Sequence, residues 1–224
     1  MTVKALAHKE WLKLKKIWWI VLGINMAVFG YFYIQLNHLF TVEHAEMIWY
    51  RAFEIGSIHY EPIQYLMVLT GTLMGLAQFI PEMIGHRFRL SLHLPLSENV
   101  MVLLSLLVGL LAVVVIGILD VLCLYTVLGA FFPAEGALSG LLTAMPWFYA
   151  GFVVYLGTAL VILEPQLFRK LVCLFVTVGF VWIFFQGETY ESFNRAFWAP
   201  ALISLLFIPA VLLPARRYRN RRAL

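Results

Sequence analysis

The sequence contains little charge. Of its 224 residues, 12% are Asp, Glu, Lys or Arg and 62% are hydrophobic, and the mean hydropathy is +0.88. A soluble domain has about 25% charged residues, because its surface must be covered by groups that interact with water. So few charges exclude soluble globular, disordered and fibrous proteins. The sequence therefore predicts an integral membrane protein.

Cysteine is also scarce. The chain has two cysteines, Cys123 and Cys173, and both lie inside apolar runs. Disulfide frameworks belong to small domains of oxidising compartments. We therefore interpret both cysteines as small buried apolar residues.

Long polar segments are missing, which leaves no room for a water-soluble catalytic domain. A transmembrane helix needs about 20 mostly apolar residues. The third apolar run contains one charged residue, Asp120, and could form one tilted helix or a span with an outer half-helix; we count one span. The sequence thus predicts a single all-α transmembrane domain with six spans, at residues 17–36, 63–81, 100–128, 141–163, 171–186 and 197–214.

Lysine and arginine are divided unevenly between the two predicted sides of the membrane. With six spans, 14 of the 16 basic residues fall on the side of the two termini, and only Arg51 and Arg195 fall on the other. Positive charge favours the cytoplasmic side, so we predict a multi-pass membrane protein with both termini cytoplasmic. The net charge of +4 then belongs to a membrane-facing rim, and we expect no nucleic-acid partner.

Residues 1–16 have an amphipathic helical pattern. Apolar side chains share one face, which Glu10 interrupts, and lysines occupy the other. This pattern is typical of a helix that lies in the membrane interface with its lysines toward anionic headgroups. A basic flank that only sets the topology is the alternative. The predicted membrane-surface residues are Lys9, Trp11, Lys13 and Lys16.

The largest predicted outer segment, residues 37–62, has a spacing that is compatible with a short surface helix. It also contains His38, His44 and His59 among four glutamates. Histidine and carboxylate groups bind transition metals, but the spacing matches no metal-site pattern. We therefore interpret these residues as solvated polar groups and predict no metal.

Residues 82–98, between the second and third spans, carry the most specific pattern. Ile84, Phe88 and Leu92 recur every four residues and predict a short amphipathic helix. Pro95 ends it, because the residue before a proline avoids the helical region, and Ser97 can cap the next span. A short helix parallel to the membrane is expected to bind a cytoplasmic partner.

The order of these segments resembles that of the ABC-2 type permeases, the membrane subunits of one class of ABC transporter. The residues that carry the resemblance are 9–16 and 82–97, with a basic N-terminal helix, a glutamate after the second span and a Leu-Pro-Leu-Ser end. The chain departs from the family at Glu98, where a basic residue is frequent. It also departs at Gly85-His86, where a glycine and a small residue are usual.

The resemblance implies a division of roles. Residues 82–93 would be the coupling helix that binds a groove of a separate ABC ATPase subunit, and residues 2–16 would be the elbow helix. Two permease copies would form the path of an exporter in a bacterial inner membrane. The chain lacks the P-loop pattern, so ATP and magnesium would bind the partner, and this chain would have no cofactor and no catalytic residues. The implied partner-binding residues are Glu82, Ile84, Arg87, Phe88, Arg89 and Leu92.

Two further features inside the spans are candidates for function or packing. Charged residues in the bilayer are expensive, so Asp120 either lines a path, pairs with a basic residue of a neighbouring helix, or marks the outer end of its span. Gly71 and Gly75 form a G-x-x-x-G pattern that lets helices approach closely. We favour packing within the chain over dimerisation.

Other function classes stay open. An intramembrane enzyme would need a convergent set of catalytic side chains, and a proton-coupled carrier would need several buried carboxylates and inverted repeats. The spans contain a single Asp and no histidine, which favours neither class. A membrane assembly subunit without a transport role is a third alternative. A neighbouring ATPase reading frame in the genome would distinguish these classes.

Overall fold

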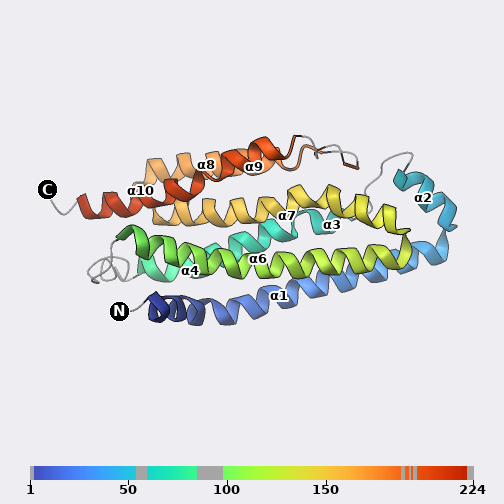
Figure 1. The fold of residues 1–224 in the computed structure, drawn as a ribbon, viewed down its shortest axis with the longest axis horizontal. Coiled ribbons are helices and arrows are strands. Elements are labelled where there is room, and N and C mark those ends of the chain that lie inside the picture. The colour runs from blue at the N-terminus through green and yellow to red at the C-terminus, as the bar shows by residue number, and fades with distance from the viewer. Residues whose placement is uncertain are drawn as a thin grey trace.

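The fold is a bundle of long helices. A computed structural model describes residues 3–53, 60–84, 98–187, 190, 191, 193 and 196–220. In Figure 1 the long helices run side by side along the longest axis, and both ends of the chain lie at the same end of the bundle; we call it the termini end. The helices are α1 (Val3–Val42), α2 (Ala45–Phe53), α3 (Glu61–Gln64), α4 (Leu66–Met83), α6 (Glu98–Phe131), α7 (Ala134–Leu163), α8 (Leu167–Ile183), α9 (Trp198–Ser204) and α10 (Phe207–Asn220).

Four of the described helices, α1, α4, α6 and α7, are long and apolar enough to cross a membrane. This confirms a multi-pass α-helical membrane protein. It also confirms that the third apolar run forms one continuous helix, α6, of 34 residues. The regions predicted as the fifth and sixth spans form shorter helices. Helix α8 has 17 residues, about 25 Å at 1.5 Å per residue, and the sixth run is divided between α9 and α10.

The structure corrects the boundary that we predicted between a surface helix and the first span. Both belong to α1, which is unbroken over 40 residues. The physical reason is that neither glycine nor proline occurs between residues 3 and 22, so nothing ends the helix. On the face predicted to lie in the membrane interface, Leu6, Leu14 and Trp18 are buried against the bundle, whereas Trp11 is exposed.

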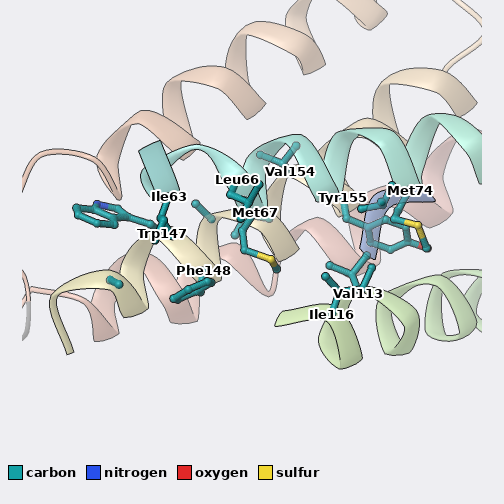
Figure 2. Close-up of a cluster of buried hydrophobic side chains, with 14 of the residues drawn as sticks. Ile63, Leu66, Met67, Met74, Val113, Ile116, Trp147, Phe148, Val154 and Tyr155 are labelled. Carbon is teal, nitrogen blue, oxygen red and sulfur yellow. The ribbon is translucent and has the colours of Figure 1, made fainter. Parts of the chain in front are cut away.

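Helices α4 and α7 approach each other closely through glycine. A Cβ atom on Gly71 would lie 2.1 Å from the backbone oxygen of Gly151, and one on Gly75 would lie 2.8 Å from a methyl group of Thr158. The G-x-x-x-G pattern therefore packs within the chain, as predicted. Buried side chains from α3, α4, α6 and α7 form the core around this crossing, and Figure 2 shows Met67, Phe148 and their neighbours gathered there.

The outer segment contains the predicted short helix. Helix α2 spans Ala45–Phe53 and buries Ile48, and Arg51 pairs with Glu43 at 2.8 Å, just after the end of α1. No group of three His, Cys, Asp or Glu side chains that could hold a metal ion occurs in the described part of the chain. His59 lies outside the described residues.

Candidate functional site: buried polar clusters between helices

Four charged residues meet at the termini end of the bundle, where the first turns of α1 contact the last turn of α4. The ammonium group of Lys13 donates to Glu82 Oε1 and to Glu10 Oε1, the latter at 2.8 Å. Lys9 Nζ lies 3.6 Å from the same Glu82 oxygen. The side chains of Glu10 and Glu82 are 3% and 12% exposed, so Lys13 neutralises charge that is largely removed from water. We call these four residues the ionic cluster.

A chain of hydrogen bonds extends from the ionic cluster into the core. The side-chain amide of Gln78 donates to Glu10 Oε2 at 3.4 Å and to the backbone oxygen of Ser105 at 2.7 Å. The hydroxyl of Tyr155 donates to Gln78 Oε1 at 2.7 Å. Gln78 and Tyr155 are both fully buried. Polar contacts therefore tie α1, α4, α6 and α7 together at one level of the bundle.

A glycine makes room for this chain of contacts. A Cβ atom on Gly109 would lie 2.0 Å from Gln78 Oε1 and 2.1 Å from the hydroxyl of Tyr155. Any side chain at this position of α6 would thus displace the hydrogen-bonded pair. The sequence around Gly109 is a uniform apolar run, which gave no indication of this role.

The predicted partner-binding residues divide into two groups. Glu82 contacts the lysines of α1, whereas Ile84, directly after α4, is 65% exposed. Arg87, Phe88, Arg89 and Leu92 lie outside the described residues.

The predicted membrane-surface residues fall into two groups, exposed side chains and side chains in ion pairs. Trp11 and Lys16 are exposed, in keeping with a surface position that stays a prediction. The ammonium group of Lys13 instead lies between two carboxylates, and Lys9 lies beside one of them. The reason is that Glu10, which interrupts the apolar face of the sequence pattern, is on the buried side of α1 and brings lysines toward it.

Asp120 belongs to a second polar cluster, deep within the bundle. It is fully buried, and the side-chain amide of Asn25 on α1 donates to its Oδ2 atom at 2.8 Å. The same amide lies 3.0 Å from the hydroxyl oxygen of Thr70 on α4. The carboxylate of Asp120 is therefore enclosed by the bundle and is not exposed on its surface.

The partner of Asp120 is an amide where the sequence suggested a basic residue. Its other oxygen, Oδ1, is buried without a hydrogen-bond partner among the described residues. Asn25 was overlooked in the sequence, although an amide within an apolar span is itself a signal of a buried polar contact.

Replacement of Asp120 by asparagine is expected to change the free energy of unfolding by less than about 1 kcal/mol, because the side-chain oxygen of asparagine can accept the same hydrogen bond from Asn25, a contact worth about that much. Asp120→Leu removes the acceptor and leaves the Asn25 amide short of a partner, so we expect a loss of about 1–3 kcal/mol. The measurement is unfolding in mixed micelles. Equal stability of both variants would show that the Asn25 contact contributes nothing.

A third buried carboxylate lies where α7 meets α10. Glu164 is 1% exposed, and its Oε2 atom lies 2.5 Å from Nη1 of Arg217. Its Oε1 atom has no hydrogen-bond partner among the described residues. The contact fixes the C-terminal helix to the end of α7, at the termini end of the bundle (Figure 1).

An apolar cavity of about 610 Å³ opens between α6, α7 and α9. Aromatic side chains such as Phe148, Phe152 and Trp198 line it. The hydroxyl of Tyr149, which also lines it, is already engaged with Ser204 at 2.8 Å and with the backbone oxygen of Ala201 at 3.0 Å. The cavity therefore suits an apolar group and offers no polar chemistry of its own among the described residues.

Comparisons with known proteins find no relative of this chain. No protein-family model matches it, and neither a curated protein nor a solved structure does so.

Proposed function

We propose that this chain is the permease subunit of an ABC transporter. It would work as a dimer with separate cytoplasmic ATPase subunits and would catalyse no reaction itself. ATP and magnesium would bind those partners. Under this proposal α8 and the α9–α10 pair complete six crossings, both termini are cytoplasmic in a bacterial inner membrane, and transport is outward. The substrate path would lie between two copies of the chain.

The observation that carries the proposal is the position of the exit from α4. Residues 82–97 carry the pattern that resembles the coupling helix of ABC-2 permeases. Helix α4 ends, at Met83, at the termini end of the bundle (Figure 1), so the segment begins on the side where the charge distribution predicts the cytoplasm. A partner that hydrolyses ATP would be on that side.

The decisive experiment concerns the apolar face of this segment. Phe88→Ala is expected to abolish the stimulation of ATP hydrolysis by the chain, because buried aromatic anchors at interfaces cost about 2 kcal/mol or more when truncated. The matched variant Arg89→Ala removes a rim charge and is expected to have a milder effect that weakens with salt. The measurement is co-purification with a candidate ABC ATPase, followed by the hydrolysis rate in lipid. Parental binding and hydrolysis by Phe88→Ala would contradict the proposal.

A second candidate, a proton-coupled carrier, gains from one observation. Glu10, Asp120 and Glu164 are each no more than 2% exposed, and such buried carboxylates are the groups that proton-coupled carriers use. The sequence had indicated only Asp120. Transport that depends on a pH gradient in vesicles without any ATPase would favour the carrier, whereas stimulated ATP hydrolysis favours the permease.

A further inference from the structure

The ionic cluster joins the first turns of α1 to the last turn of α4, directly before the segment proposed to bind the ATPase. Glu82 is the last but one residue of α4, and its carboxylate contacts both Lys13 and Lys9. The next described helix, α6, begins at Glu98. Helix α4 therefore ends at the point where it is held to α1 by charge.

The same cluster reaches the start of α6. A cavity of about 20 Å³ is lined by residues of α1, α4, α6 and α7, among them Glu10, Glu82 and Ser105. A space of this size holds about one water molecule, provided that two or more polar partners surround it. The last turn of α4 and the first turns of α6 thus border the same small cavity, beside the carboxylates of the ionic cluster.

We infer that Lys13 and Glu82 are positioning residues, which hold the exit of α4 against α1 and so fix the start of the partner-binding segment. Movement of that segment would pass to α1 through Lys13, and to α7 through Glu10, Gln78 and Tyr155. The consequence for partner binding rests on the proposed permease function. The contact between α1 and α4 can be tested independently of that function.

Glu82→Gln is the cleanest variant for the test. It removes the charge that joins the two helices while it leaves the buried Glu10–Lys13 pair intact at 2.8 Å. The matched control is Glu43→Gln, which breaks the Glu43–Arg51 ion pair at the other end of α1. Glu82→Asp keeps the charge and should behave like the parent chain.

The first measurement is the distance between spin labels on cysteines that replace Leu12 and Ile84, which are 55% and 65% exposed. Both native cysteines are replaced by alanine. We expect a narrow distance distribution in the parent chain and in the Glu43→Gln control, and a clearly broader one in Glu82→Gln. An unchanged distribution in Glu82→Gln would overturn the inference, whatever the chain's function.

The second measurement is the stimulation of the same candidate ABC ATPase. Glu82→Gln is expected to reduce it toward the basal rate, with Glu82→Asp restoring it, although the complex still assembles. If Phe88→Ala abolishes stimulation but Glu82→Gln does not change it, the positioning role is overturned and the permease proposal stands. If the parent chain gives no stimulation, the permease proposal fails, and the distance measurement alone decides whether the cluster holds α4 to α1.

Discussion

Replacement of Gly71 by alanine is expected to lower the free energy of unfolding by about 3 kcal/mol, the upper part of the range for overpacked cores. The new methyl group would lie 2.1 Å from the backbone oxygen of Gly151 and 3.2 Å from the backbone nitrogen of Tyr155. Backbone atoms cannot rotate out of the way as a flexible side chain can. Helices α4 and α7 would therefore have to separate along their whole crossing.

A control for this variant exists on α1. A Cβ atom on Gly23 meets nothing within 4 Å, so Gly23→Ala should stabilise the helix by roughly 0.5–1 kcal/mol through its backbone propensity alone. Both variants are unfolded in mixed micelles with increasing fractions of denaturant, and their unfolding midpoints are compared. If Gly71→Ala unfolds at the same midpoint as Gly23→Ala, the close crossing of α4 and α7 does not exist.

The second large effect is expected for Lys13→Met. This change leaves the Glu10 carboxylate, which is 3% exposed, without a cation, while Glu82 keeps only Lys9 at 3.6 Å. Breaking a buried ion pair from one side costs about 3–5 kcal/mol, because an uncompensated charge stays in a poorly solvated place. We expect a destabilised chain whose yield and unfolding midpoint in micelles both fall.

The double variant Glu10→Leu/Lys13→Met should recover most of the lost stability. Replacing both members of a buried pair by apolar groups of similar size is often neutral or stabilising, and Gln78 keeps its hydrogen bond to the backbone oxygen of Ser105. Lys13→Arg, which keeps the charge, is the second control. A double variant that is less stable than Lys13→Met alone would show that the network depends on Glu10 itself, against the expectation.

The apolar runs were sufficient to predict the helical membrane bundle, because the length of a run and its hydrophobicity are local properties. The end of a helix is also local, but it needs a signal. The boundary predicted near residue 16 was wrong because an amphipathic pattern followed by an apolar run contains no signal that ends a helix, and α1 continues through it. In the sixth run, by contrast, Pro209 follows the interruption between α9 and α10. A proline removes the helical hydrogen bond to the residue four positions before it, which here is Leu205.

The candidate site was predictable only in part. Asp120 and Glu82 stood out, since isolated charges next to or within apolar runs are visible in the sequence. Their partners did not, because Asn25 lies 95 positions from Asp120 and Lys13 lies 69 positions from Glu82. Which faces of two such distant helices meet depends on close approaches such as the one at Gly109. Pairing between helices is a property of the packed bundle and not of any one segment.

The unbroken α1 also constrains how the bundle can move in a bilayer. Its 40 residues make a rod of about 60 Å, roughly twice the thickness of the hydrocarbon layer. Charged contacts hold it near both ends, at Lys13 on one side and beside Arg51 on the other. Axial sliding would draw one of these ends toward lipid, which is expensive for charged groups. The rod can therefore respond to a force at one end mainly by changing its tilt, the adjustment that transmembrane helices make most readily.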